Sequence, residues 1–342
     1  MSDLAACLNS KEVDKLRRAL LAWYKRNRRD LPWRRNNDPY RVWVSEIMLQ
    51  QTRVAAVLDH YARFIRRFPT IQTLAAAREA SVLAAWSGLG YYHRARRLHK
   101  ATKVIVRGQR GRFPATAEEW KELPGIGRYT AAAIASIAFG EHAAVVDGNV
   151  ERVLTRISGR EEGRHPVWEW AQTLLDPKRP GDFNQAMMEL GAIICTPKRP
   201  QCKLCPLKAW CKSRGADAMR RQAPRKHRQV CYALVHKGHA ILLVQRPANA
   251  SLMACMWELP TVLDGKCIGN EPLTRLRHTI TDTDYEVSVI ALSPDALQWS
   301  EACTRWFSPR QWKRMPLTGL TRKVLRELRV ASLLSARESK GR

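Results

Sequence analysis

The 342-residue sequence has no long hydrophobic run. Its most apolar stretch, AAAIASIAF at residues 131–139, is followed by Gly140 and Glu141 and is far shorter than the roughly 20 residues that a membrane-spanning helix needs. Residues 1–15 lack the apolar core of a secretory signal, and no segment repeats at a fixed period. We therefore expect a protein that has no membrane segment and stays in the cytoplasm.

Acidic side chains are scarce relative to basic ones. The sequence has 31 Asp and Glu against 59 Lys and Arg, which gives a formal net charge of +28. The excess positive charges repel one another in a compact chain, and a polyanion would neutralise them, so a polyanion is the natural partner. A basic surface that only keeps the protein soluble is the alternative, and an anionic membrane is disfavoured because the basic residues are spread along the chain. With 45% hydrophobic residues the chain can form a core, and its length suggests two domains.

Four of the nine cysteines lie close together in the sequence. Cys195, Cys202, Cys205 and Cys211 are spaced C-x6-C-x2-C-x5-C. Without an export signal we expect a reducing compartment, where grouped thiols bind metal more often than they form disulfides. The spacing predicts a metal centre and leaves two possibilities open, a zinc ion or an iron–sulfur cluster.

The chain as far as residue 212 is predicted to be helical. Asp38 before Pro39 is typical of a helix start, and Thr116 with Glu119 matches a capping box. The turn PGIG at 124–127 then precedes an alanine-rich helix over 128–139, which predicts a helix-hairpin-helix. Gly125 and Gly127 allow backbone N–H groups at a helix N-terminus to hold a phosphate, although such a turn is often only a turn.

A basic stretch without apolar periodicity, residues 213–229, is predicted to be a linker. Beyond it the pattern changes to strands. Residues 230–247 predict two strands around a turn at Lys237 and Gly238, and 285–292 predict a further strand. Residues 321–336 have the period of a helix, so the second domain is expected to be α+β.

Two carboxylates lie in contrasting surroundings. Glu46 has Val42, Trp43 and Leu49 as helical neighbours, which desolvate a carboxyl group, raise its pKa and suit it to act as a general acid. Asp147 precedes a helix that begins near Gly148, where backbone N–H groups favour the ionised form. Such a pair is typical of an acid with a companion carboxylate, although each residue alone could be a solvated helix residue or an ordinary N-cap.

Six segments occur in the order found in the MutY family of adenine DNA glycosylases, which belongs to the helix-hairpin-helix glycosylase superfamily. The segments are WVSEIMLQQTRV, GLGYYHRARRLH, LPGIGRYTAAAI, VVDGNVERVL, FNQAMMELGAIICT and the four-cysteine loop. The resemblance is dense over residues 10–215. It implies an all-α helix-hairpin-helix glycosylase domain over 1–212, with the hairpin at about 116–139 and an iron–sulfur loop over 195–211. After the linker at 213–229 it implies an α+β, Nudix-like mispair-recognition domain over 230–342.

The resemblance also implies an activity, the removal of adenine mispaired with 8-oxoguanine or guanine to leave an abasic site. It assigns Glu46 to protonation of the adenine and Asp147 to stabilisation of the sugar cation. By the same resemblance Tyr129 and Asn149 lie near that centre, and Gln51 and Tyr91 fill or wedge the DNA helix. The resemblance places Trp33, Arg34, Leu49 and Gln185 around the adenine. It assigns Cys195, Cys202, Cys205 and Cys211 to one 4Fe-4S cluster.

Position 129 separates close relatives. Glycosylases that resemble endonuclease III have a lysine there, whose amine attacks the sugar and leads to strand cleavage. Tyr129 cannot form that Schiff base, so we expect a monofunctional glycosylase. The expected partner is double-stranded DNA with an A:8-oxoguanine or A:G mispair, and the expected state is a monomer in a bacterial cytoplasm, associated with the nucleoid.

The second domain departs from the family pattern at two places. Between Leu259 and Thr279 the only acidic residues are Asp264 and Glu271, so the metal-binding glutamates of a Nudix hydrolase are missing and nucleotide hydrolysis is not expected. The Phe-Ser-His loop with which many members recognise 8-oxoguanine corresponds here to residues 280–282. Its hydroxyl is retained as Thr281, whereas an aspartate, Asp282, replaces the histidine.

Two other functions compete with this interpretation. One is a glycosylase for thymine glycol or uracil on the same scaffold, which Tyr129, the FNQ segment and the second domain argue against. The other is a DNA-binding protein that senses redox state through its cluster and has no catalysis. The presence of both Glu46 and Asp147 argues against that function.

We predict that deleting residues 230–342 slows excision of adenine opposite 8-oxoguanine more than opposite guanine, and that Asp282→His increases this preference. Each polar contact to a base is worth roughly 1–3 kcal/mol, which changes selectivity tenfold or more. Single-turnover excision rates on the two duplexes measure both effects. Equal losses after truncation would show that the domain supplies only general affinity, and no gain from Asp282→His would place the recognition loop elsewhere.

Overall fold

The computed structural model describes residues 8–108, 111–159, 166–213, 226–250, 252–262, 271–280, 283–296, 303–312 and 315–328. The chain divides into two compact units, the first made of residues 1–76 and 97–221 and the second of residues 77–96 and 222–342. Within the described ranges, the structure contains no helix with the length and apolar character needed to cross a bilayer.

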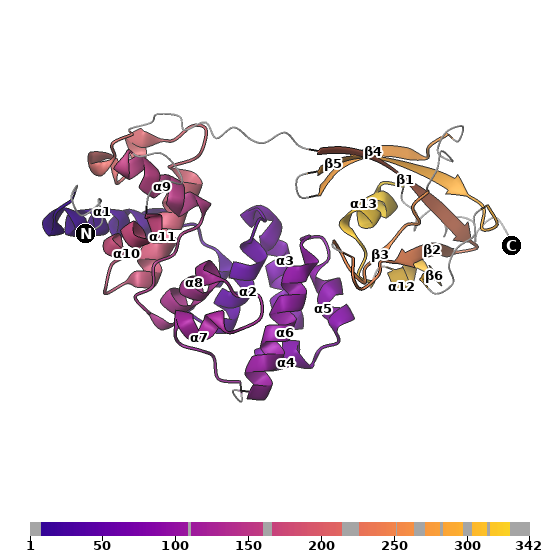
Figure 1. Ribbon diagram of the computed structural model, residues 1–342, viewed down its shortest axis with the longest axis horizontal. Coiled ribbons are helices and arrows are strands. Elements are labelled where there is room, and N and C mark those ends of the chain that lie inside the picture. The colour runs from indigo at the N-terminus through magenta and orange to yellow at the C-terminus, as the bar shows by residue number, and fades with distance from the viewer. Residues whose placement is uncertain are drawn as a thin grey trace. The chain divides into compact units, whose positions relative to one another are not determined.

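The described residues as far as residue 212 contain helices and loops but no strand, as predicted (Figure 1). The elements are α1 (Ser10–Asn27), η1 (Pro32–Arg34), α2 (Pro39–Leu49), α3 (Val54–Arg67), α4 (Ile71–Ala76), α5 (Glu79–Trp86), α6 (Tyr92–Gly108), α7 (Ala117–Lys121), α8 (Arg128–Phe139), α9 (Gly148–Ser158), α10 (Val167–Leu174), α11 (Pro180–Ile193), η2 (Cys202–Leu204) and η3 (Lys208–Trp210), where η denotes a 3₁₀ helix.

Local capping explains where the helices of the site begin. The Asp38 side chain accepts a hydrogen bond of 2.8 Å from the backbone N–H of Tyr40 at the start of α2. Thr116 and Glu119 form the predicted capping box of α7, and Gly140 ends α8 in the left-handed region with a φ of 73°. These starts and ends confirm the predictions made from the sequence, because each depends on hydrogen bonds between near neighbours.

The predicted turn between α7 and α8 is present, and its first glycine is required there. Gly125 has a φ of 82°, and a Cβ atom at this position would lie 2.5 Å from the Cβ of Arg97 in α6. Any side chain would therefore be strained in its backbone and would also collide with α6. The absence of a side chain at Gly125 therefore allows the hairpin to approach α6 closely.

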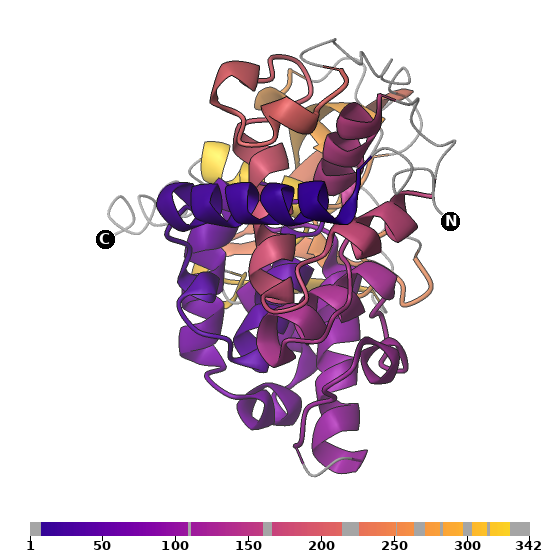
Figure 2. The same cartoon turned by 90° about the vertical axis from the view of Figure 1, so that its left-hand side faces the viewer.

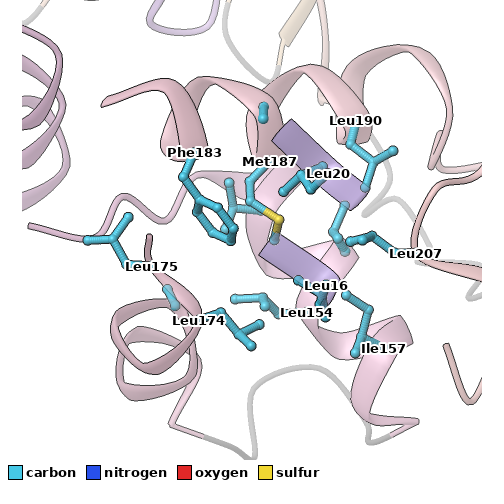
Figure 3. Close-up of a cluster of buried hydrophobic side chains, with 14 of the residues drawn as sticks. Leu16, Leu20, Leu154, Ile157, Leu174, Leu175, Phe183, Met187, Leu190 and Leu207 are labelled. Carbon is cyan, nitrogen blue, oxygen red and sulfur yellow. The ribbon is translucent and has the colours of Figure 1, made fainter. Parts of the chain in front are cut away.

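One hydrophobic cluster joins the N-terminal helix to the helices of the site. Leu16 and Leu20 of α1 pack among Phe183 and Leu190 of α11 and Leu154 of α9 (Figure 3). Figure 2 shows α1, in indigo, crossing this group of helices. The cluster fixes the relation between α9 and α11, which both line the site described below.

The second unit contains a mixed sheet, so the α+β prediction is confirmed. Its elements are β1 (Lys226–Lys237), β2 (Ala240–Gln245), β3 (Trp257–Glu258), β4 (Thr274–Ile280), β5 (Thr283–Leu292), β6 (Thr304–Phe307), α12 (Pro309–Trp312) and α13 (Gly319–Glu327). The strand order is β3-β2-β1-β5-β4, with β6 also on β2. Among the described strands, β1 and β5 pair in parallel and the other pairs are antiparallel. Leu320 and Val324 of α13 belong to the same hydrophobic cluster as Leu234 of β1 and Val287 of β5. Figure 1 shows α13 beside the sheet.

Two boundaries differ from the sequence prediction. Residues 226–229, expected in the linker, begin β1 because they pair in parallel with residues 283–286 of β5. Residues 77–96, expected in the first domain, group with the second unit, where the hydroxyls of Ser87 and Tyr92 both donate to the carbonyl of Leu317. Residues 214–225 of the predicted linker, and the predicted helix beyond residue 328, lie outside the described residues.

We predict that Gly181→Ala lowers the free energy of unfolding by about 1–3 kcal/mol. A Cβ atom at Gly181 of α11 would lie 2.6 Å from the carbonyl oxygen of Ser136 and 2.8 Å from the Cα of Ile137, both backbone atoms of α8. Urea unfolding measures the change. Gly108→Ala is the control, because nothing lies within 4 Å of a Cβ at that position. Equal effects of the two substitutions would contradict the close approach of α8 and α11.

Candidate active site

A pocket of about 190 Å³ lies in the first unit among η1, α2, α8, α9 and α11. Eight residues that the sequence analysis selected line it: Trp33, Arg34, Glu46, Leu49, Tyr129, Asp147, Asn149 and Gln185. They come from segments far apart in the chain, so their convergence is a property of the fold. The fold therefore brings these eight residues together around one pocket.

Glu46 lies at the wall of this pocket with 6% of its surface exposed. Burial raises the pKa of its carboxyl group to about 7, and the nearby charge of Asp147 acts in the same direction. A hydrogen bond from Tyr129 and the charge of Arg34 act in the opposite direction without cancelling the effect of burial. The predicted desolvation of Glu46 is thus present, and the group can hold a proton near neutral pH.

Tyr129 is the direct partner of Glu46. Its hydroxyl donates to Oε2 of Glu46 over 2.9 Å and lies 3.4 Å from the Sδ atom of Met188. Burial, followed by the neighbouring charges of Glu46 and Asp147, raises the pKa of Tyr129 well above its ordinary value. The phenol therefore keeps its proton and holds the Glu46 carboxyl group in place.

Asp147 is the N-cap of α9, as predicted. Its Oδ1 atom accepts from the backbone N–H groups of Asn149, at 2.9 Å, and Val150, at 2.7 Å. The side-chain amide of Asn149 donates to Oδ2 over 2.8 Å. Both carboxylate oxygens of Asp147 thus accept hydrogen bonds, which fix the side chain beside the pocket.

Arg152 holds Asn149 in turn. Its guanidinium donates to Oδ1 of Asn149 over 2.8 Å and to the carbonyls of Gly191, at 2.8 Å, and Cys195, at 2.9 Å. A Cβ atom at Gly191 would lie only 2.6 Å from the Cβ of Asn149, so α11 and α9 meet here at close range. The orientation of Asp147 therefore depends on contacts that reach the cysteine loop.

The pocket wall also contains a buried ion cluster that was not predicted from the sequence. Glu189 of α11 is 0% exposed and accepts hydrogen bonds from Arg29 and Arg34 at 2.7–3.0 Å. Burial alone would raise its pKa, but the bonds from the two arginines outweigh burial and lower the pKa to about 2. The sequence does contain a signal for such a cluster. Glu189 is the only charged residue between Asp182 and Lys198, in an otherwise apolar helix, and a charged residue in such a place is usually buried with a partner.

The two residues assigned to wedging the DNA helix lie outside the pocket lining. Gln51, with a φ of 54°, and Tyr91, with a φ of 47°, are two of the four described non-glycine residues with positive φ. Such backbone strain persists only where the surroundings enforce it, and it is often found at functional sites. Arg94 supports the loop before Tyr91, because its guanidinium lies 5.2 Å from the Tyr91 ring centre and donates to the carbonyl of Gly90.

The remaining predicted contacts with DNA are at the hairpin and in the second unit. Gly127 is the N-cap of α8, and no side chain caps the N–H groups of the first turn of that helix. Gly125 forms the tight turn before it. Thr281, predicted to contact the base opposite adenine, lies outside the described residues, as does Asp282.

The cysteine loop is fastened to α9 by a buried arginine. Arg156 donates to the sulfur of Cys195, at 3.3 Å, and to the carbonyls of Thr196, at 2.8 Å, and Pro197, at 3.0 Å. Burial raises the pKa of the Cys205 thiol to about 11, and the proximity of the other three cysteines, Cys195, Cys202 and Cys211, adds to the shift. Within the described part of the chain, no three His, Cys, Asp or Glu side chains are grouped closely enough to bind a single metal ion.

Comparison with known proteins shows what this chain is similar to. Residues 44–174 match the HhH-GPD superfamily of base excision DNA repair proteins. The chain is 41% identical over 317 residues to an adenine DNA glycosylase of Rattus norvegicus, covering 73% of this chain and 61% of that protein. It is 39% identical over 350 residues to an adenine DNA glycosylase of Homo sapiens, covering 78% and 64%. The matched part of this chain thus spans slightly less than two thirds of the length of these two relatives.

A solved structure is also similar. The structure of a thermostable thymine-DNA glycosylase superposes with a TM-score of 0.56 at 31% identity, covering 60% of this chain and 97% of that one.

We predict that the ionisation of Glu46 makes the folded state less stable as the pH rises. Its pKa is raised from 4.5 to about 7 in the folded state, so the folded protein binds the proton more tightly between these values. The free energy of unfolding should fall by up to about 3 kcal/mol across this window, and Glu46→Gln should abolish that fall. Urea unfolding of both proteins at pH 5, 6, 7 and 8 measures it. An identical pH dependence in the two proteins would contradict the raised pKa.

Proposed function

Because this chain belongs to the adenine DNA glycosylase family of the helix-hairpin-helix superfamily of base excision DNA repair proteins, we propose that it removes adenine from DNA. The proposed substrate is double-stranded DNA in which adenine is mispaired with 8-oxoguanine or guanine. The reaction hydrolyses the N-glycosidic bond and leaves an abasic site.

The pairing of Glu46 with Asp147 in one pocket carries this proposal. Burial favours the protonated form of Glu46, whereas backbone N–H groups and the Asn149 amide surround Asp147 with donors. A carboxyl group that holds a proton, next to a second carboxyl group fixed by hydrogen-bond donors, provides an acid and a group that can stabilise a cation. The adenine would enter among Trp33, Leu49 and the polar groups of the same pocket.

The chemistry then divides between the two carboxyl groups. Glu46 transfers its proton to a ring nitrogen of the adenine, and the bond between the base and C1′ of the sugar breaks with its electron pair going to the base. The Asp147 carboxylate stabilises the positive charge that develops on the sugar. Water adds at C1′, and the proton that it releases restores the acid. Tyr129 holds Glu46 and provides no amine, so no Schiff base forms and the strand is not cleaved.

The similarity to a thymine-DNA glycosylase supports a second candidate function, the excision of a damaged or mispaired pyrimidine. The 41% identity to an adenine DNA glycosylase over 73% of this chain favours adenine. The two candidate functions differ in substrate and use the same pair of carboxyl groups.

The second unit is proposed to recognise the base opposite the adenine through residues 280–282.

The four cysteines are proposed to hold one 4Fe-4S cluster. The four thiols lie in one short loop and are near enough to one another to raise the pKa of Cys205. A 4Fe-4S cluster is wider than a single ion and binds each thiolate to a different iron, so the four sulfurs do not have to converge on one metal position, and the residues present fit such a group. When bound, the cluster supplies a rigid crosslink among the thiolates. With the loop fixed in this way, its basic residues would be placed to bind DNA phosphates; they are Lys198, Arg199, Lys203, Lys208 and Lys212.

We predict that Glu46→Gln and Asp147→Ser each slow adenine excision by at least about a hundredfold while mispair binding remains. The glutamine cannot donate the proton. The serine retains the N-cap of α9 but loses the negative charge, so its stability should stay within about 1 kcal/mol of the original. Single-turnover assays with alkali treatment measure the rates, and gel shifts measure binding.

The substrate panel for these assays contains A:8-oxoguanine, A:G, thymine glycol and U:G duplexes. Alkali-labile product from only the two adenine duplexes is the expected result, and strand cleavage should require the alkali. Excision of thymine glycol or uracil faster than adenine would establish the second candidate. Substantial excision by Glu46→Gln would refute its role as the acid.

We predict that the anaerobically purified protein is brown and absorbs at about 400 nm, as thiolate-bound iron–sulfur clusters do. Cys205→Ser should reduce this absorbance and weaken DNA binding, with the helical content measured by circular dichroism as a control for folding. Cys303→Ser is the matched control, because Cys303 lies in the second unit and is exposed. Stoichiometric zinc in a colourless protein would overturn the assignment.

A further inference from the structure

The carboxylate of Glu189 uses both oxygens to bind two arginines in the pocket wall. Oε1 accepts from the backbone N–H of Arg29 at 3.0 Å and from its Nε at 2.7 Å. Oε2 accepts from Nη2 of Arg29 at 2.7 Å and from Nη2 of Arg34 at 2.9 Å. Arg29, Arg34, Glu189 and Glu46 all line the same pocket.

A buried ion cluster of this kind is costly unless it is fully hydrogen-bonded, because each charge has been taken out of water. The guanidinium of Arg34 is only 11% exposed, so its charge is weakly screened. Without a counterion it would act on the carboxyl group of Glu46 across the pocket. Glu189 is the described carboxylate that pairs directly with Arg34.

We propose that Glu189 is a positioning residue that fixes Arg34 in the pocket wall and neutralises its charge, so that Glu46 remains protonated when adenine is bound. This role rests on the proposed function, in which Glu46 is the acid. Because Glu189 is 0% exposed and both its oxygens bind arginines, its proposed effect on the reacting atoms is indirect, through Arg34.

The groups that face Glu46 come from several elements, and their effects have different signs. Asp147, at the start of α9, and burial favour its protonated form, whereas the hydrogen bond from Tyr129 of α8 and the charge of Arg34 in η1 favour the ionised form. Arg29 and Glu189 act on this balance through Arg34. Removing the negative charge of Glu189 therefore leaves Arg34 uncompensated and shifts Glu46 toward its ionised form.

The alternative is that Glu189 only holds α11 to the segment between α1 and η1. That structural role would lower stability and all rates without moving a titration midpoint. A pH profile separates the two roles, because only the change in charge alters the pH at which the acid ionises.

Single-turnover excision from an A:8-oxoguanine duplex at saturating enzyme is measured from pH 5 to pH 9. The rate of the original protein should fall as the pH rises through about 7, where Glu46 ionises. For Glu189→Gln we expect the midpoint about one unit lower, which means a roughly tenfold slower rate at pH 8.5 and little change at pH 5.5. Arg34→Gln should move the midpoint upward.

Glu189→Asp is the matched control, because it retains the charge. Its rates should fall at every pH while the midpoint stays at the original value. A midpoint unchanged in Glu189→Gln would overturn the proposal. Folding of Glu189→Gln is checked by circular dichroism and thermal melting. If this variant does not fold, the test is Arg34→Gln, and a pH midpoint of excision that does not rise in Arg34→Gln overturns the proposal.

An infrared titration of the Glu46 carboxyl, taken as the difference between each protein and its Glu46→Gln derivative, reads the same shift without catalysis. A shift in this titration together with full excision by Glu46→Gln would reject the proposed acid and keep the effect of Glu189. Loss of excision in Glu46→Gln, without any shift of the Glu46 titration in Glu189→Gln, would keep Glu46 as the acid and reject the proposed effect of Glu189. The two failures are therefore distinguishable.

Discussion

The burial of one carboxyl group, that of Glu46, is the constraint on which the rest of the site depends. A buried carboxyl group keeps its proton only while nearby positive charges, which favour ionisation, are offset by nearby negative charges. Tyr129 and Arg34 pull toward ionisation, and Asp147 opposes them. Moving any one of these groups changes the state of the acid, so the helices that hold them cannot shift independently.

Close packing between helices provides this rigidity. Leu16 and Leu20 of α1 are buried against α9 and α11, the two helices that place Asp147 and Glu189. Two glycines of α11 set the distances: a side chain at Gly181 would collide with α8, and one at Gly191 with Asn149. Hydrophobic burial thus brings the helices together, and the absence of side chains at these two positions lets α11 approach α8 and α9 closely. Hydrogen bonds then cross both contacts, from Asn184 to the hydroxyl of Ser136 and from Arg152 to the carbonyl of Gly191.

The two residues that are proposed to distort DNA are constrained by their backbone conformation and not by burial. Gln51 and Tyr91 have left-handed backbone conformations, which cost free energy in any residue with a side chain. At Tyr91 the surrounding loop is held by Arg94 and, one residue on, by the hydroxyl of Tyr92, which donates to Leu317 in the second unit. The helical pocket and this strained loop are therefore supported by separate sets of contacts.

The sequence by itself determined the features that depend on near neighbours. The caps at Asp38, Thr116 and Asp147 join residues two or three positions apart, and the burial of Glu46 follows from the apolar residues of its own helix. Tertiary structure alone decided the rest. Tyr129 binds Glu46 across 83 positions, Glu189 binds Arg29 across 160, and β1 begins at Lys226 because β5 pairs with it. Local hydrogen bonds are encoded in short patterns, whereas a buried ion cluster exists only after distant elements have packed, because only packing removes the water that would otherwise separate its charges.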